Sequence, residues 1–226
     1  DEDNKERYYA EIIRSIIATG TSDAFIAQFC VLIKECAVDR LHILGDIYDR
    51  GPHADRIMEE LRRFHEVDIQ WGNHDIAWMG AVAGNQACVA SVLRRCVSYN
   101  NFDLLEDGYG INLRPLSMFA AKTYGDDPCE RFLPHVLDEN IYDPVDTILA
   151  SKMHKALAIL EFKLEGQLLR RHPEYEMNDR ILLSKIDFDT YTVEVEGKRY
   201  EMLDHHFPTV DPTDPIALTA EEQELI

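Results

Sequence analysis

Two short motifs bring together side chains that could carry out chemistry on a phosphate. The first is Gly-Asp-Ile-Tyr-Asp-Arg-Gly at residues 45–51, and the second is Gly-Asn-His-Asp at residues 72–75. Carboxylate and amide oxygens are typical ligands of hard divalent cations, an imidazole transfers protons near neutral pH, and a guanidinium keeps its positive charge. This combination predicts a metal-assisted attack on a phosphate group.

Both motifs directly follow short apolar segments, at residues 41–44 and 67–71, which we predict to be buried strands. Between these segments, residues 54–65 carry apolar side chains on one helical face, so the three elements form a βαβ unit with parallel strands. Because the carboxyl ends of parallel strands lie at the same edge of a sheet, the two motifs should lie side by side. The glycines that precede Asp46 and Asn73 should let the backbone turn sharply there.

The two motifs together resemble the pattern of the calcineurin-like metallophosphoesterases, which include the Ser/Thr protein phosphatases. The longer segments LHILGDIYDRGPHADRIM, VDIQWGNHDIAWMGA and RRHPEYEMNDR are similar to the class III fructose-1,6-bisphosphatases of bacteria, the Firmicutes type. The similarity covers nearly the whole chain. It implies an α/β metallophosphoesterase sandwich, a two-metal site with Mn²⁺, and hydrolysis of fructose 1,6-bisphosphate to fructose 6-phosphate and phosphate in gluconeogenesis.

The resemblance also implies a role for five side chains of the two motifs. Asp46 takes the position of the carboxylate that bridges two metals, and Asn73 takes that of an amide ligand to the second metal. His74 takes the position of the general acid that protonates the leaving alkoxide, while Asp49 orients its imidazole and favours the charged form. Arg50 takes the position of the residue that binds two phosphate oxygens, which suits a planar guanidinium.

Other polar residues have both a functional and a structural interpretation. Asp75 caps a turn or belongs to the site, and His53 packs or reaches the substrate from beyond Arg50. We predict that His42 is a packed histidine inside the sheet. The remaining candidates, for which we favour structural or surface roles, are Tyr48, Trp78, His154, Arg170, Arg171, His172, His205 and His206.

Part of the family pattern is missing from this chain. No strand-borne Asp-x-His precedes Gly45, and no apolar strand that ends in His follows Trp71. Two protein oxygens do not hold a transition metal tightly. We therefore expect an internal fragment of a longer enzyme, inactive by itself, that binds a divalent metal only at roughly millimolar concentration.

Composition narrows the choice of partners. The net charge of −19 over 226 residues disfavours nucleic acid and anionic membranes, whereas metal ions and Arg50 would reverse the sign locally for a small phosphorylated sugar. No apolar run is long enough to span a bilayer. The five cysteines are odd in number and lack a C-x-x-C pair, which predicts a reduced, cytoplasmic chain without cysteine catalysis.

The predicted fold is helix-rich α/β, in three parts of one catalytic domain. Residues 1–75 form the α/β portion, with two amino-terminal helices that cover one face of the sheet; residues 76–180 form a helical insertion; and residues 181–226 form a β-meander with an acidic tail. The predicted elements are helices at residues 5–19, 24–37, 87–99, 116–124 and 148–171, a loop at residues 138–144, and strands at residues 181–186, 190–194 and 199–203.

Two other functions stay open on the sequence alone. Both motifs also occur in the protein and dinucleotide phosphatases of the same superfamily. The choice of a sugar substrate therefore rests on the resemblance alone. A non-catalytic interaction module, whose helical insertion binds a partner or a second copy of the chain, would fit the missing metal ligands.

Overall fold

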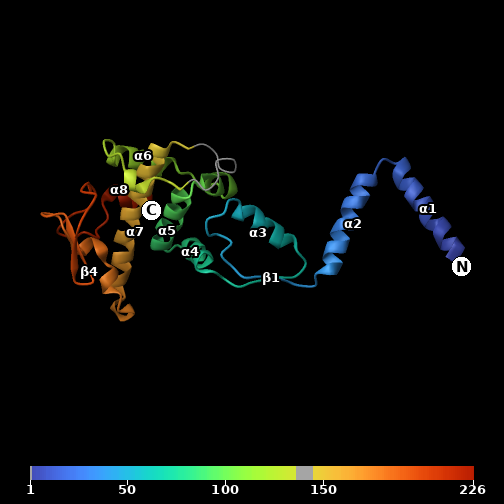
Figure 1. Cartoon of the computed structure of the whole chain (residues 1–226), viewed down its shortest axis with the longest axis horizontal. Coiled ribbons are helices and arrows are strands. Elements are labelled where there is room, and N and C mark those ends of the chain that lie inside the picture. Colours follow the sequence, from blue (N-terminus) through green and yellow to red (C-terminus); the bar gives the residue numbers. More distant parts are fainter. Residues whose placement is uncertain (1, 136–144) are drawn as a thin grey trace. The chain divides into compact units, whose positions relative to one another are not determined.

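The computed structural model describes residues 2–135 and 145–226 and has a helix-rich α/β fold (Figure 1). The predicted loop at residues 138–144 lies outside the described residues. The helices are α1 (Glu2–Ala18), α2 (Ser22–Ala37), α3 (Ala54–Arg63), α4 (Asn73–Val82), α5 (Gln86–Ser98), α6 (Arg114–Thr123), α7 (Thr147–Arg171) and α8 (Ala220–Leu225). The strands are β1 (Leu41–Ile43), β2 (Val67–Ile69), β3 (Ile186–Asp187), β4 (Thr192–Val195) and β5 (Lys198–Glu201).

By its internal contacts the chain divides into two compact units. The first comprises Asp1–Leu44 and Glu59–Gln70, and the second comprises Gly45–Met58 and Trp71–Ile226. Among the described residues, no helix combines the length and the apolar character that crossing a membrane requires.

The predicted parallel strand pair is confirmed in the first unit. β1 pairs with β2 in parallel, with Leu41 opposite Val67 and Ile43 opposite Ile69, and helix α3 connects them in the sequence. Both strands are shorter than predicted, since each pairs over only three residues. The two strands therefore end at the same edge of this small sheet, and each motif follows one of them in the sequence.

The prediction that His42 is buried in the sheet is wrong. Its side chain is 50% exposed and forms an ion pair with Asp68 of β2. Successive side chains of a strand point to opposite faces, so His42 lies on the face opposite to that of Leu41 and Ile43. The register then places the imidazole beside a carboxylate in solvent.

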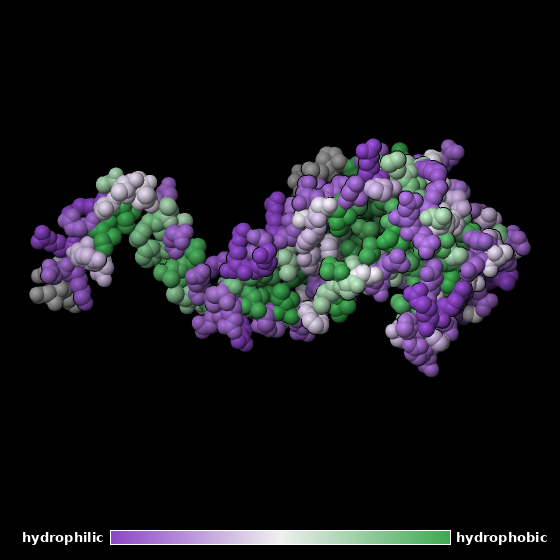
Figure 2. All heavy atoms as spheres, turned by 180° about the vertical axis from the view of Figure 1, so that it is seen from behind, coloured by the Kyte–Doolittle hydropathy of each residue, from purple (hydrophilic) through white to green (hydrophobic). Residues whose placement is uncertain are grey.

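The prediction that the first two helices bury their apolar faces on the sheet is also wrong. Helix α2 has no buried residue, and the exposed fraction is 64% for Ile17 of α1 and 62% for Ile33 of α2. Apolar side chains are visible on the surface of these helices in Figure 2. Two three-residue strands offer too little area to cover two helices of this length.

The core of the second unit is built around helix α7. Helices α5 and α6 pack against it, and α4 packs against α5. The predicted helices at residues 87–99, 116–124 and 148–171 are confirmed to within two residues at each end. The largest buried apolar side chains of the core include Val97, Leu105, Tyr124, Leu157 and Leu160.

The carboxyl-terminal strands form the predicted meander, with the antiparallel order β3-β4-β5. The predicted strand at residues 181–186 is largely wrong, because Leu182–Lys185 form a 3₁₀ helix and β3 begins only at Ile186. Leu183 is buried in that 3₁₀ helix. A short apolar run does not by itself distinguish a strand from a tight helical turn that packs on α7.

Candidate active site

The first motif leaves β1 through a sharp turn. Gly45 and Asp46 both have left-handed backbone conformations, with φ angles of 90° and 55°. Glycine adopts that region freely, and aspartate is among the side chains that tolerate it best. The predicted turn after the first strand is therefore confirmed.

Gly72 is needed for a different reason from the one the sequence suggested. Its φ angle of −82° is open to any residue. However, a Cβ atom at this position would lie 2.0 Å from Oδ1 and 2.6 Å from the backbone nitrogen of Asp46. The two motifs therefore touch at Asp46 and Gly72, as the parallel strands predict.

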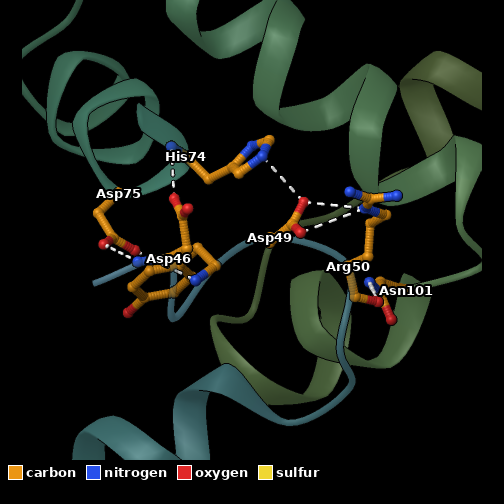
Figure 3. A network of polar contacts seen from close by, with 7 residues as sticks. Asp46, Asp49, Arg50, His74, Asp75 and Asn101 are labelled. Atoms are coloured by element: carbon orange, nitrogen blue, oxygen red, sulfur yellow. Dashed lines mark hydrogen bonds and ion pairs between the residues drawn. The ribbon is translucent and has the colours of Figure 1, made fainter. Parts of the chain in front are cut away.

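Asp75 joins the backbones of the two motifs. Its carboxylate accepts hydrogen bonds from the N–H groups of Asp46 at 2.7 Å, Gly72 at 2.9 Å and Tyr48 at 3.2 Å. The residue is only 6% exposed, and these bonds replace the water that burial removes. Of its two interpretations, the capping role is the one that these contacts show (Figure 3).

The carboxylate of Asp46 lies at the start of α4. Its Oδ1 atom accepts a hydrogen bond from the His74 N–H at 3.3 Å, where the positive end of the helix dipole favours an anion (Figure 3). Both Asp46 and the neighbouring Asn73 are exposed. Both residues are therefore accessible to solvent near the junction of the two motifs.

The side-chain oxygens of Asp46 and Asn73 suit a hard divalent cation as part of a ligand set. Carboxylate and amide oxygens are the donors that Mg²⁺, Mn²⁺ and Ca²⁺ prefer. Among residues 2–135 and 145–226, no group of three or more His, Cys, Asp and Glu side chains could hold a metal ion. The described residues therefore do not by themselves form a complete metal site.

Asp49 lies between the imidazole and the guanidinium of the candidate site. Its Oδ1 atom is 2.9 Å from Nε2 of His74, and its two oxygens accept bonds from Nε of Arg50 at 3.1 and 3.2 Å (Figure 3). The His74 side chain is 12% exposed, and its Nδ1 atom is buried without a hydrogen-bond partner in the described part of the chain. One carboxylate therefore orients both the imidazole and the guanidinium.

Arg50 has further contacts with residues of the helical insertion. Its guanidinium carbon lies 5.6 Å from the centre of the Tyr99 ring, and its backbone carbonyl accepts a bond from Asn101 Nδ2 at 3.1 Å. The hydrogen bond to Asp49, with the charge of that carboxylate, raises the pKa of Arg50 above its ordinary value. The guanidinium therefore stays charged at any physiological pH.

Tyr48 of the first motif and Trp78 of α4 pack against each other, in the structural role that the sequence favoured for both. Their ring centres are 4.6 Å apart, and the Tyr48 hydroxyl lies 2.6 Å from that of Tyr109. Burial, followed by the hydrogen bond to Tyr109, raises the pKa of Tyr48, so this phenol stays protonated. Tyr48 and Trp78 both pack against the buried apolar core of the second unit.

The other candidates have local partners or backbone roles. His53 has a left-handed backbone with a φ angle of 61°, and its carbonyl accepts hydrogen bonds from the N–H groups of Arg56 and Ile57 in α3. Burial lowers the pKa of His154, which favours the neutral imidazole. The remaining contacts join His154 to the Phe132 carbonyl, Arg170 to Asp214, His172 to Glu174, His205 to the Met202 carbonyl and His206 to Asp127.

Tyr99 and Asn101 contact Arg50 but were not among the site residues predicted from the sequence. Two asparagines directly after an apolar helix are a signal for the end of that helix, which was available in the sequence. No local pattern indicates that the residue at such an end contacts Arg50, which lies about fifty positions earlier in the chain.

Comparisons of the sequence with known proteins identify one family over its whole length. A profile described as Firmicute fructose-1,6-bisphosphatase matches residues 1–226. The chain is 52% identical over 226 residues to a protein of Clostridium tetani, covering 100% of this chain and 34% of that protein. It is 50% identical over 223 residues to a protein of Alkaliphilus metalliredigens, covering 99% of this chain and 34% of that protein.

A protein of Listeria monocytogenes is 49% identical over 227 residues, covering 100% of this chain and 35% of that protein. All three relatives are named fructose-1,6-bisphosphatase class 3. This chain therefore spans about a third of the length of the curated relatives that it matches. No solved structure matches it.

Proposed function

The chain belongs to the Firmicute fructose-1,6-bisphosphatase family, and we propose that it supplies part of the active site of a phosphomonoesterase. The proposed reaction is hydrolysis of fructose 1,6-bisphosphate to fructose 6-phosphate and phosphate. The observation that carries the proposal is the junction of the two motifs, where Asp46 meets Gly72 and Asp49 contacts both His74 and Arg50. The relatives' names support the sugar substrate.

The proposal extends to the architecture. The paired strands β1 and β2, with helix α3 between them in the sequence, would belong to a metallophosphoesterase sandwich. Residues 1–75 and 181–226 would form the catalytic domain, and residues 76–180 would be its helical insertion.

Asp46 and Asn73 would hold a divalent ion, for which we propose Mn²⁺. When bound, such an ion supplies positive charge that polarises a phosphate and lowers the pKa of a coordinated water. The chain's own contribution is to fix the two oxygens. The contact with Gly72 and the hydrogen bond from the His74 N–H limit the positions that the Asp46 carboxylate can take.

His74 would be the general acid of the reaction, with Asp49 as the residue that orients it. The 2.9 Å contact between Asp49 and Nε2 fixes the direction of the imidazole, and a positioned imidazole is a common proton donor to a departing alkoxide. The low exposure of the imidazole keeps the ring in one orientation. A positioned proton donor of this kind contributes a factor of about 10²–10⁴ to the rate.

Arg50 would bind the phosphate. Its Nε atom is held by Asp49, and its side chain is 52% exposed, so a phosphate can approach the guanidinium from solvent. A planar guanidinium matches the spacing of two phosphate oxygens, and its charge does not titrate away. A lysine at this position would keep the charge but lose the paired geometry.

The test is phosphate release by a protein of the relatives' full length that contains this sequence, with Mn²⁺ present. Fructose 1,6-bisphosphate, a phosphoserine peptide and diadenosine tetraphosphate are compared side by side. We expect preference for the sugar bisphosphate, and no turnover by the 226-residue chain alone. Preference for the peptide or for the dinucleotide would contradict the proposed substrate.

Two substitutions test the roles of the residues in that protein. We expect His74→Ala to lower kcat by about 10²–10⁴-fold, in line with the loss of a positioned proton donor. His172→Ala is the matched control, because His172 is a partly exposed histidine outside the candidate site that pairs with Glu174. Equal activity of the two variants would contradict the role of His74.

A further inference from the structure

The carboxyl-terminal end of helix α5 has a defined geometry. Asn100 follows the helix in a left-handed conformation with a φ angle of 59°. The N–H of Asn101 donates to the Cys96 carbonyl at 2.8 Å, and the N–H of Asn100 donates to the Val97 carbonyl at 3.3 Å. This pair of bonds is a Schellman cap, which ends the helix and reverses the direction of the chain.

The reversal brings the side chain of Asn101 to the first motif. Its Nδ2 atom donates to the backbone carbonyl of Arg50 at 3.1 Å, as Figure 3 shows. Asn101 is 5% exposed, so this amide is desolvated and its bond to the carbonyl is not replaced by water. The bond holds the backbone from which the Arg50 side chain extends.

Tyr99 is the carboxyl-terminal cap residue of α5, and it contacts the guanidinium end of the Arg50 side chain. Its ring centre lies 5.6 Å from the guanidinium carbon of Arg50, within the range of a cation–π contact. With Asp49 bound to Nε, the guanidinium has a carboxylate and an aromatic ring as neighbours. These contacts restrict its orientation, although the side chain is half exposed.

We propose that the carboxyl-terminal end of α5 positions Arg50 for phosphate binding, with Asn101 fixing its backbone and Tyr99 fixing its guanidinium. Both are positioning residues, because they act through Arg50 and not on the substrate. The helical insertion would then be part of the phosphate site, in addition to any role as a lid or assembly surface. This inference rests on the proposed function of Arg50.

The positioning itself is tested on the 226-residue chain without substrate. The readout is the exchange rate of the Arg50 Nε–H proton with water, measured by ¹⁵N NMR. We expect exchange to become about fivefold faster in Asn101→Ala, in line with the net contribution of one hydrogen bond. For Tyr99→Leu we expect about two- to fivefold faster exchange. Tyr99→Phe keeps the ring but loses the hydroxyl, which is hydrogen-bonded to Arg50, so its exchange rate should lie between those of the parent chain and of Tyr99→Leu.

Asn85→Ala is the matched control for these variants. Asn85 caps the opposite end of α5 by accepting the Cys88 N–H at 3.0 Å. It therefore reports the effect of weakening α5 without touching Arg50. An Arg50 exchange rate in Asn101→Ala that equals the rate in Asn85→Ala would overturn the proposal.

The link to function is tested by kinetics in a protein of the relatives' full length. We expect Asn101→Ala to raise the KM for fructose 1,6-bisphosphate about fivefold with kcat nearly unchanged, because the lost interaction acts on binding. In an Arg50→Ala background the same substitution should have no further effect, as a double-mutant cycle requires of a residue that acts through Arg50.

The possible outcomes separate this inference from the proposed function. An equal effect of Asn101→Ala with and without Arg50 would indicate general destabilisation and overturn the positioning role. If Asn101→Ala speeds Arg50 exchange but the parent protein hydrolyses none of the phosphate esters, the positioning of Arg50 stands as geometry, whereas its use for phosphate binding is refuted together with the proposed function.

Discussion

Replacing Gly72 by alanine perturbs the contact that joins the two motifs. The backbone at Gly72 has an extended conformation that alanine also adopts, so no backbone strain is introduced. The new methyl group would instead overlap Asp46. Turning the Asp46 side chain relieves the 2.0 Å approach to Oδ1, but the 2.6 Å distance to its backbone nitrogen remains. The two loops must therefore move apart.

The size of the effect follows from these contacts. Overpacking of this kind costs about 1–3 kcal/mol. Separation of the loops also weakens the bonds that Asp75 accepts from Asp46 and Gly72, each with a net contribution of about 0.5–1.5 kcal/mol. We expect Gly72→Ala to lower the free energy of unfolding by about 2–5 kcal/mol.

Urea denaturation followed by circular dichroism measures this change, and hydrogen exchange locates it. The amide protons of Asp46 and Tyr48 should lose protection, because both donate to Asp75. Gly51→Ala is the matched control, since a Cβ at Gly51 would meet no atom within 4 Å. An unfolding free energy within about 0.5 kcal/mol of that control, with the Asp46 amide still protected, would refute the reasoning.

Three further results are expected from buried or paired side chains. Asp75→Ala removes the acceptor of three backbone N–H groups, so it should lower the free energy of unfolding by about 2–3 kcal/mol; a loss below about 0.5 kcal/mol in urea denaturation would contradict this. Burial tends to raise the pKa of Asp127, but hydrogen bonds, above all from Lys155, lower it below its ordinary value. The ionised Asp127 should therefore stabilise the fold fully above about pH 4, and this stabilisation should be lost as the pH falls through the lowered pKa. If the free energy of unfolding falls in acid to the same extent in Asp127→Asn, this expectation is contradicted. Burial raises the pKa of Cys96 to about 12, so a thiol reagent at pH 8 should label the exposed Cys30 and spare Cys96 until the chain unfolds; equal labelling rates would refute the buried position.

The predictions that succeeded rest on local rules. Strand ends marked by Gly45 and Gly72, with one amphipathic helix between the strands, are sufficient to place the two motifs side by side. Whether His42 is buried depends instead on which face of the sheet is covered by other elements, and no local sequence pattern indicates that face. The same holds for α1 and α2, whose apolar stripes predict a buried face but not its partner.

The candidate site divides in the same way. The residue types of Asp46 and His74 indicated their chemistry, and the βαβ geometry indicated that their motifs meet. The contacts of Arg50 with Tyr99 and Asn101 join segments far apart in the sequence through tertiary packing. Only the structure provides that pairing, because a helix end specifies how the chain turns and not what it meets.

The most direct test of the proposed site is where Mn²⁺ binds on the 226-residue chain. Paramagnetic broadening of amide signals during a Mn²⁺ titration reports this position without any assay of activity. Asp46→Asn keeps the size of the side chain and removes its charge. Asparagine also tolerates the left-handed backbone at this position, so the turn is not strained. Asp211→Asn is the control, because Asp211 is an exposed carboxylate that accepts bonds within its own turn.

We predict that the signals of Asp46, Asn73 and His74 broaden first, at Mn²⁺ concentrations of about a millimolar. Asp46→Asn should abolish this preference, and Asp211→Asn should leave it unchanged. Broadening spread over the acidic surface without a maximum at these residues, or an unchanged pattern in Asp46→Asn, would contradict the assignment of the metal site.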